Sequence, residues 1–354
     1  MEIIAFYTSK TFKTGSHRRY KRALEALSLR HNVTLFYKGD VSSNFNLKNG
    51  CKKKITWFGV AKTLSEKILT KKDVSFFGFG LEPCFYGCIW ALLFKRRAIS
   101  FIRGYELADA RESQNLLSNL RLIKVVFYEY SIILLSKKIV YQTASHLDYI
   151  LENYKLARSV LIRKAIVLPN DLPPSLPKES WGHEVCERKK NVVFVGSLIP
   201  RKNVDMLIQA FLECNELYDS LDIIGDGPLN NSLKKKYAEE SKVNFIGQTK
   251  KAQCFIRQAY LVVVPSNRDP YPNVALEAIS ESTVIIGNNV PGVRDILLYN
   301  DLLFSDKKTL VEKLTMISNS LEYHSKLKDR VVKRKDDLSF DWDAEVSKII
   351  ENCS

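Results

Sequence analysis

The chain of 354 residues is 45% hydrophobic and 26% charged, a composition typical of a soluble globular protein with room for two domains. Its net charge of +15 is unevenly placed, because 33 of the 54 Lys and Arg residues but only 16 of the 39 acids precede residue 191. This asymmetry predicts an anionic partner for the first half, and the two longest apolar runs (84–94 and 125–135) are too short to span a bilayer.

The seven cysteines are scattered along the chain, and no histidine lies at a metal-binding spacing from any of them. This usage indicates a reducing cytosol and no structural metal. Cys84 and Cys88 are one helical turn apart, which favours two small core residues over a site. The opening stretch MEIIAFYTSK does not have the pattern of a signal peptide.

Strand and helix patterns alternate along both halves. In the first half a strand at 3–7 is followed by a loop with Gly15, a helix at 17–30 and a strand at 33–36. The second half repeats this order, with strands expected at 191–198, 221–224, 243–247, 260–266 and 283–287. Such regular alternation predicts an α/β fold of two doubly wound domains, with ligands in a cleft beyond the carboxyl ends of the strands.

The stretch at 171–190 is rich in proline and has no apolar period, so it is expected to be a linker. The predicted domains are therefore 1–170 and 191–335, with a closing segment at 336–354.

A strand, a glycine loop and two adjacent cations open the second half. Gly196 permits close approach of a ligand to the backbone, and Arg201 and Lys202 lie at a helix entrance, where cations can hold a diphosphate. The alternative is a solvated pair of cations. Gly227 follows the next strand in a glycine turn, which serves equally well as a tight turn alone.

Two acids flank a predicted helix start in PSNRDPYPNVALEA. Asp269 lies in the loop after a strand, the helix begins near Pro272 and Asn273, and Glu277 lies one turn inside it. Both carboxylates can reach one ligand at the helix entrance. The alternative is a chance pair of surface acids.

These segments together resemble the large retaining glycosyltransferase family of the GT-B fold, often called family 4, which includes many bacterial transferases of lipopolysaccharide, capsule and exopolysaccharide assembly. The resemblance rests on residues 191–300, through VGSLIPRKNVDMLIQAF, DIIGDGP, VNFIGQ, YLVVVPSNRDPYPNVALEAISES and GVRDIL. It is weaker in the first half, through the opening strand and loop, FIRGYEL and IVLPND. The segment at 339–353 is similar to the family's closing helix, which returns to the N-terminal domain.

The resemblance implies two Rossmann-like domains, an N-terminal one for the acceptor and a C-terminal one for a nucleotide-sugar donor such as a UDP- or GDP-sugar. It implies that Arg201 and Lys202 bind the donor diphosphate, that Glu277 holds the ribose and that Asp269 lies beside the sugar. The remaining donor contacts that it implies are Gly15, Gly196, Gly227, Gln248, Asn273 and Val274, with Arg103 and Glu106 on the acceptor side. No cofactor and no metal are implied, and the one Asp-x-Asp stretch, Asp341 to Asp343, is interpreted as structural.

Three positions depart from the family pattern. Asp269 stands where the family usually has Glu, Ser16 follows Gly15 where paired glycines are usual, and Arg103 precedes Gly104 where histidine is common. These departures keep open a different class of function, a non-catalytic nucleotide-sugar-binding or scaffold subunit of a polysaccharide assembly complex.

The basic first half contains a candidate membrane helix at 56–69. Trp57, Ala61, Leu64 and Ile68 share one helical face between two lysine- and arginine-rich clusters, as in helices that lie on anionic membranes. The alternative is a helix packed on its own sheet. No zinc pattern, basic heptad or aromatic RNA-binding motif supports a nucleic-acid partner. The sequence thus predicts a cytoplasmic glycosyltransferase, peripheral at the inner face of the cell membrane, that acts on a glycan or lipid-linked acceptor.

Overall fold

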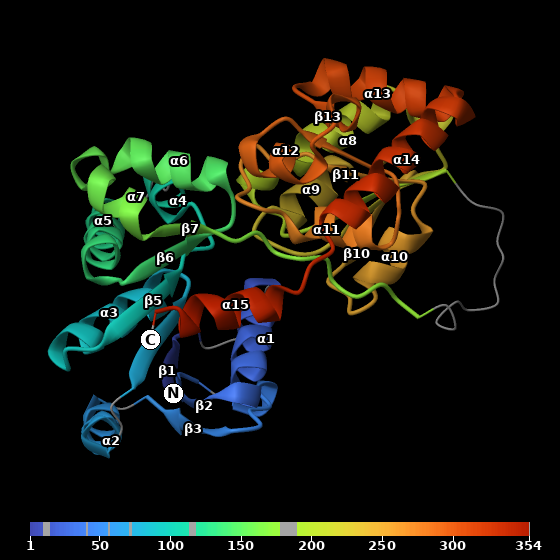
Figure 1. The fold of residues 1–354 in the computed structure, drawn as a ribbon. Helices are drawn as coiled ribbons and strands as arrows, with labels where there is room; N and C mark the ends of the chain where they lie inside the picture. Colours follow the sequence, from blue (N-terminus) through green and yellow to red (C-terminus); the bar gives the residue numbers. More distant parts are fainter. Residues whose placement is uncertain are drawn as a thin grey trace. The chain divides into compact units, whose positions relative to one another are not determined.

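The computed structural model describes residues 1–9, 15–39, 42–55, 57–70, 73–112, 118–177 and 190–353. The chain forms two compact units (Figure 1). The first unit is Met1–Pro169 together with Asp341–Ser354, and the second is Asn170–Phe340. Each unit contains one parallel β-sheet with helices packed on it.

The sheet of the first unit has seven parallel strands in the order β3-β2-β1-β4-β5-β6-β7. These strands are β1 (Glu2–Tyr7), β2 (Asn32–Tyr37), β3 (Gly50–Lys54), β4 (Val74–Phe79), β5 (Arg97–Phe101), β6 (Lys138–Tyr141) and β7 (Ala165–Val167). The helices are α1 (Gly15–Arg30), η1 (Ser42–Asn44), α2 (Trp57–Thr70), α3 (Leu81–Leu93), α4 (Glu106–Glu112), α5 (Ser118–Leu135), α6 (Ala144–Asn153), η2 (Lys155–Ala157), α7 (Arg158–Lys164) and α15 (Trp342–Glu351). The strand order reverses between β1 and β4, the position where doubly wound sheets bind ligands.

Helices cover both faces of this sheet. Buried side chains from α2, α3, α5, α6 and α7 form one apolar core with alternate residues of the strands, such as Ile4 and Phe76. On the other face α1 packs through Tyr20, whose ring stacks on Tyr7 and Phe79. The alternation follows from the pleat of a strand, which sends successive side chains to opposite faces.

The predicted membrane helix is α2, and its apolar face packs inward. Val60 and Leu64 are buried in the core of the first unit. The expectation that Leu64 faces a membrane is therefore wrong, because the apolar stripe serves to attach α2 to its own sheet. The side chains of Trp57 and Ile68 lie outside the described ones. Cys84 and Cys88 are buried core residues, as expected.

Helix α15 packs against α1 within the first unit. Trp342 is fully buried, and the guanidinium of Arg19 lies 5.1 Å from the centre of its ring. Asp343 pairs with Arg22 at 3.0 Å, and the carboxylate of Asp341 accepts a hydrogen bond from the Ala344 amide at 3.0 Å. Both aspartates of the Asp-x-Asp stretch thus have structural partners within the first unit.

The sheet of the second unit has six parallel strands in the order β10-β9-β8-β11-β12-β13. These strands are β8 (Asn191–Val195), β9 (Ser220–Ile224), β10 (Val243–Gly247), β11 (Leu261–Val264), β12 (Ile285–Asn288) and β13 (Leu303–Phe304). The helices are η4 (Pro200–Lys202), α8 (Val204–Leu212), η5 (Asn215–Leu217), α9 (Asn230–Lys236), α10 (Ala252–Gln258), α11 (Asn273–Ser280), α12 (Pro291–Leu297), η6 (Asn300–Leu302), α13 (Lys307–Asn319) and α14 (Leu321–Asp337). The order again reverses, here between β8 and β11.

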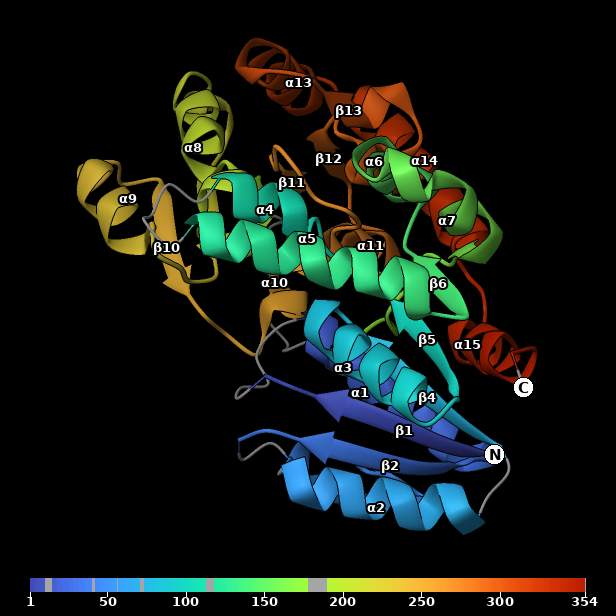
Figure 2. The same cartoon turned by 90° about the vertical axis from the view of Figure 1, so that its left-hand side faces the viewer.

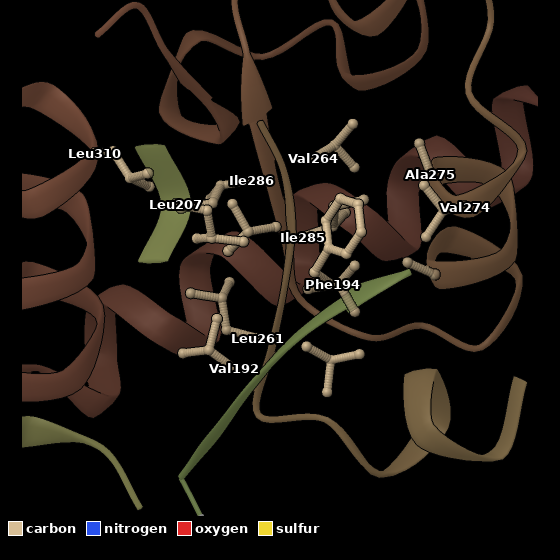
Figure 3. Packing of buried hydrophobic residues seen from close by; sticks show 14 of the residues in the cluster. Val192, Phe194, Leu207, Leu261, Val264, Val274, Ala275, Ile285, Ile286 and Leu310 are labelled. Atoms are coloured by element: carbon tan, nitrogen blue, oxygen red, sulfur yellow. The ribbon is translucent and has the colours of Figure 1, made fainter. Parts of the chain in front are cut away.

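The core of the second unit explains why its central strands are short apolar runs. Leu261 to Val264 are all buried, because helices cover both faces of the sheet. Figure 3 shows Val192 and Leu261 of the strands near Leu207 of α8, while Val274 and Ala275 of α11 lie beside Phe194. Both units are thus doubly wound α/β structures, which confirms the predicted fold class.

Candidate functional site

The crossover in the second unit brings together two loops that the sequence singled out. The loop after β8 contains Arg201 and Lys202, and the loop after β11 contains Asp269. Since β8 and β11 are neighbouring parallel strands, their carboxyl ends meet at one edge of the sheet. Residues more than sixty positions apart in the chain therefore form one cluster.

An ion pair lies at the centre of this cluster. The Lys202 ammonium donates a hydrogen bond to Oδ2 of Asp269, and Nη1 of Arg201 lies 3.8 Å from the same oxygen. The Asp269 residue is 7% exposed, and the Lys202 side chain is 14% exposed. The Tyr271 amide also donates to the Asp269 carboxylate, at 3.3 Å. The sequence analysis assigned Asp269 and the cations to different parts of a donor and did not foresee their direct contact.

Backbone and side-chain hydrogen bonds fasten the two loops together. The Asn267 amide donates to the Arg201 carbonyl at 2.9 Å, and Nη1 of Arg201 donates to the Arg268 carbonyl at 3.3 Å. The side-chain amide of Asn203 donates through Nδ2 to Oδ1 of Asn267 at 2.9 Å. Asn203 has a φ of 52°, a left-handed conformation that asparagine tolerates well. The sequence analysis did not identify Asn203 or Asn267 as site residues. Asn203 could have been identified, because an asparagine directly before a helix is a common capping signal.

Glycines on neighbouring segments allow close approach to both loops. A Cβ on Gly292 would lie 2.0 Å from the Asp269 carbonyl oxygen, and a Cβ on Gly225 would lie 1.9 Å from the Gly196 carbonyl oxygen. A Cβ on Gly227 would lie 2.5 Å from the Leu198 carbonyl oxygen. The packing of these loops requires Gly225, Gly227 and Gly292 without any ligand, so the predicted donor contacts of Gly196 and Gly227 remain predictions.

Helix α11 begins at Asn273, as predicted, and lies directly after the Asp269 loop. The Asn273 side chain accepts a hydrogen bond from Asn170 at 3.4 Å, and Val274 points into the core. Glu277 is partly exposed one turn along the helix, whereas Gln248 is exposed after β10. The structure therefore groups Asp269, Asn273 and Glu277 along one segment, whereas the side chain of Val274 is buried in the core.

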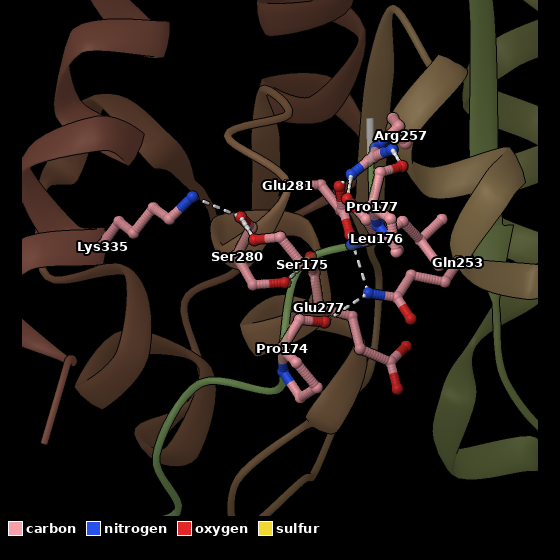
Figure 4. A network of polar contacts seen from close by, with 10 residues as sticks. All are labelled: Pro174, Ser175, Leu176, Pro177, Gln253, Arg257, Glu277, Ser280, Glu281 and Lys335. Carbon is pink, nitrogen blue, oxygen red and sulfur yellow. Dashed lines mark hydrogen bonds and ion pairs between the residues drawn. The ribbon is translucent and has the colours of Figure 1, made fainter. Parts of the chain in front are cut away.

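A buried carboxylate at the end of α11 ties the start of the predicted linker to the second unit (Figure 4). Glu281 accepts hydrogen bonds from the Leu176 amide at 2.8 Å, from Gln253 at 2.7 Å and from Nε of Arg257 at 2.6 Å. The hydroxyl of Ser175 donates to the Ser280 carbonyl at 2.6 Å. Residues 174–177 are thus fixed beside the helix that carries Glu277. The sequence analysis missed this network, because the segment has no apolar period.

The first unit contains a cavity of about 390 Å³ at its own crossover point. Its walls follow β1, β4 and β5 and include the start of α3 and the side of α5. The lining residues that carry charge or can hydrogen-bond include Tyr7, His17, Tyr20, Glu82, Arg103, Glu106, Arg121, Lys124 and Tyr128. The two predicted acceptor-side residues, Arg103 and Glu106, therefore lie together in one cavity. Gly15 begins α1, but the preceding loop at 10–14 lies outside the described residues.

Arg103 lies over aromatic rings in this cavity. Its guanidinium is 4.9 Å from the ring centre of Phe79 and 5.1 Å from that of Phe101, and Nη1 donates to the Leu168 carbonyl at 3.4 Å. Burial, together with the nearby Arg19, lowers the pKa of Arg103 to about 9. Burial also lowers the pKa of His17, which favours a neutral imidazole in the cavity wall.

A histidine from another element lies against the glycine that follows Arg103. Nε2 of His146, in α6, is 3.2 Å from the Gly104 carbonyl oxygen. His146 is fully buried, and burial lowers its pKa to about 4, so it is neutral at physiological pH. It supports the Gly104 turn from inside the fold, and the sequence analysis did not identify it.

Among solved structures the fold matches that of GT-B glycosyltransferases. Anabaena HepE in complex with UDP matches with a TM-score of 0.77 at 13% identity, over 99% of each chain. WaaG, a glycosyltransferase involved in lipopolysaccharide biosynthesis, matches with a TM-score of 0.68 at 16% identity, over 100% of each chain. The chain therefore has the GT-B fold.

Residues 189–320 match the model of the family described as glycosyl transferases group 1. An uncharacterised glycosyltransferase from Methanocaldococcus jannaschii is 29% identical over 38% of this chain and 40% of that protein. Another from Haemophilus influenzae is 25% identical over 53% of this chain and 52% of that protein. The chain thus spans about half the length or less of these curated relatives. The resemblance of residues 191–300 to glycosyltransferases is confirmed, while the family 4 type and the retaining mode remain predictions.

Within the described ranges, no helix combines the length and apolarity needed to cross a bilayer. The same ranges contain no group of three or more His, Cys, Asp or Glu residues placed to hold a metal ion.

Proposed function

We propose that the chain is a retaining glycosyltransferase that moves a sugar from a nucleotide-sugar donor to a glycan or lipid-linked acceptor. The observation that carries this proposal is the cluster of Arg201, Lys202 and Asp269 at the crossover of the second sheet. Two cations at that position suit a diphosphate, because guanidinium and ammonium groups bind phosphate oxygens strongly. The UDP and UDP-glucose complexes of HepE support a nucleotide-sugar as the ligand class.

The chemistry assigned to the cluster is stabilisation of a leaving group. As the nucleoside diphosphate departs, negative charge grows on its phosphate oxygens, and preorganised cations stabilise that charge. Asp269 fixes the Lys202 side chain in one orientation before a donor arrives. Losing one such stabilising cation typically costs about 3–4 kcal/mol of transition-state stabilisation, which is roughly a hundred- to a thousandfold in rate.

The remaining donor contacts are proposed along α11 and the glycine loops. Glu277 would hold the ribose, and the backbone amides of Asn273 and Val274 would meet the sugar or phosphate. Gly196 and Gly227 would border the diphosphate, and Gln248 would lie near the base. No metal ion is needed in this scheme, because the two cations take its role.

The cavity of the first unit is the proposed acceptor site. Arg103 and Glu106 can donate to and accept from sugar hydroxyls, and aromatic rings such as Tyr128 offer flat surfaces to a pyranose. We place the reaction in the assembly of a cell-surface polysaccharide such as O-antigen, capsule or exopolysaccharide. WaaG, with the same fold and a role in lipopolysaccharide biosynthesis, supports this assignment. We also propose a location in the cytoplasm, at the inner face of the membrane.

A calorimetric binding screen of UDP-, GDP-, ADP- and dTDP-sugars tests the donor site. At least one donor is expected to bind, and Lys202→Ala is expected to weaken binding and lower the turnover of that donor by a hundredfold or more. Lys236→Ala is the matched control, because its ammonium lies in the same unit on an exposed surface, paired with Asp205. Binding without turnover across donors and acceptors would favour a scaffold subunit, and no binding at all would refute the site.

A further inference from the structure

Exposed apolar side chains gather on one helical layer of the first unit. Among the described residues, α3, α5 and the η2–α7 segment carry eight large apolar side chains that are more than half exposed. These residues, here called the outer apolar face, are Leu92, Leu93, Leu120, Ile123, Phe127, Leu134, Leu156 and Ile162. The α3 helix and the η2–α7 segment both pack against α5, so these elements form one layer. Figure 2 shows α3, α5 and α7 on the same side of the unit.

Helix α5 has two apolar sides with different partners. Val125, Ile132 and Ile133 point into the core of the first unit. Leu120, Ile123, Phe127 and Leu134 are exposed, and at about 100° per residue they fall within roughly 60° of the helix circumference. They extend over about 21 Å of helix at 1.5 Å per residue. The exposed row therefore lies opposite the packed one, as in a helix that lies in a membrane interface.

Exposed cations lie on the same segments as the outer apolar face. In α3, α5, η2–α7 and the residues directly after them, the exposed cations are Lys95, Arg121, Lys124, Lys137, Lys155, Arg158 and Arg163. The acids of the same segments are Glu82, which pairs with Lys124 at 2.9 Å, and Glu129, which is buried. The layer thus combines a strong positive charge with exposed apolar side chains.

We propose that the outer apolar face docks on an anionic lipid membrane. A second copy of the chain is a poor occupant, because a symmetric interface would place these cations against the same cations of the other copy. An anionic bilayer satisfies both features, since its headgroups attract the cations and its acyl boundary accepts Leu, Ile and Phe side chains. Leu156 is 93% exposed at the tip of η2, which suits insertion at the headgroup level.

This inference moves the membrane contact from α2, whose Val60 and Leu64 are buried, to α5. It does not depend on the donor chemistry proposed above, so a vesicle-binding assay tests it separately. Two arms of that assay address the apolar row and the cations.

The first arm compares co-sedimentation with phosphatidylcholine vesicles that contain or lack phosphatidylglycerol. The full chain is expected to bind the anionic vesicles and not the neutral ones. The double variant Ile123→Ser and Phe127→Ser is expected to lose about a hundredfold in partitioning, or tenfold per side chain, where tenfold is about 1.4 kcal/mol. The control is Met316→Ser with Leu321→Ser, because both residues are exposed on the second unit.

The second arm removes three cations by Lys155→Gln, Arg158→Gln and Arg163→Gln. A loss of about a hundredfold is expected, from roughly fivefold for each cation near the surface. The control with equal loss of charge is Lys234→Gln, Lys235→Gln and Lys308→Gln, all exposed on the second unit.

Three outcomes would overturn the proposal. The first is a full chain that does not bind anionic vesicles, and the second is vesicle binding that each variant set and its control reduce equally. The third is unchanged vesicle binding by the Ile123 and Phe127 variant together with conversion of an oligomer to a monomer in sedimentation velocity. That result would assign the face to contacts between copies. Thermal unfolding at the wild-type temperature verifies that each variant is folded.

Discussion

Replacing Glu281 by alanine is expected to destabilise the second unit strongly. The Glu281 side chain is 1% exposed and that of Arg257 is 16% exposed, so the pair is largely removed from water. The carboxylate also accepts from the Leu176 amide and from Gln253, and both donors would lose this partner. Breaking a buried pair by removing one partner costs about 3–5 kcal/mol. For a unit of this size that corresponds to a fall in melting temperature of roughly 6–20 °C.

Differential scanning calorimetry with far-UV circular dichroism measures the effect, since two units need not unfold in one step. The matched control is Glu213→Ala, because Glu213 pairs with Lys307 in the same unit with both side chains more than 40% exposed. Exposed pairs contribute about 0–1 kcal/mol, so this control should shift the transition little. The reasoning fails if both variants lower the melting temperature equally, because burial would then not determine the strength of the Glu281 network.

The remaining predictions concern the donor loop and the buried ionisable groups. Asp269→Glu adds a methylene in a tightly packed site and is expected to change donor preference by about tenfold or more in kcat/KM, whereas unchanged kinetics for every donor would remove Asp269 from the site. Gly292→Ala is expected to weaken UDP binding and lower the melting temperature, because the added Cβ would lie 2.0 Å from the Asp269 carbonyl oxygen. Gly87→Ala is the control, since its added Cβ would have its nearest contact at 3.6 Å. Equal effects of the two substitutions would contradict the close approach at Gly292. Burial lowers the pKa of His146 to about 4, so its contribution to the free energy of unfolding is complete above pH 6.5 and falls by about 3 kcal/mol as the pH drops to 4. Burial raises the pKa of Glu129 to about 7, so ionisation of this carboxyl lowers the free energy of unfolding as the pH rises from 4.5 to 7. Urea unfolding between pH 4.5 and 7 should therefore show stability rising with pH in Glu129→Gln and falling with pH in His146→Gln, and parallel slopes would refute the assignment.

The sequence predicted the elements that depend on local pattern. Apolar runs such as 261–264 became buried parallel strands, and the start of α11 at Asn273 followed from the Pro-Asn pair before it. The grouping of Arg201 and Lys202 with Asp269 could also be predicted, because a doubly wound sheet places β8 beside β11. Local pattern and fold class together therefore place these two loops at one edge of the sheet.

Long-range packing was not predictable in the same way. Glu281 meets Leu176 across more than a hundred residues, and no local period in the 171–177 segment indicates the contact. Helix α5 is apolar on two sides, so periodicity does not tell which side faces the core. For α2 the apolar stripe was predicted to face a membrane, but it packs on the sheet of the first unit. An amphipathic helix suits either partner, so periodicity does not distinguish them.

The place of α15 in the first unit has a consequence for biosynthesis. Its Trp342 packs against α1, so the first unit needs residues that leave the ribosome only after the whole second unit. Domains generally fold as they are synthesised, from the N-terminus onward. All residues of the second unit therefore enter the chain before the last helix of the first unit. A chain that stops soon after residue 340 would contain the whole second unit beside a first unit that still lacks its last helix.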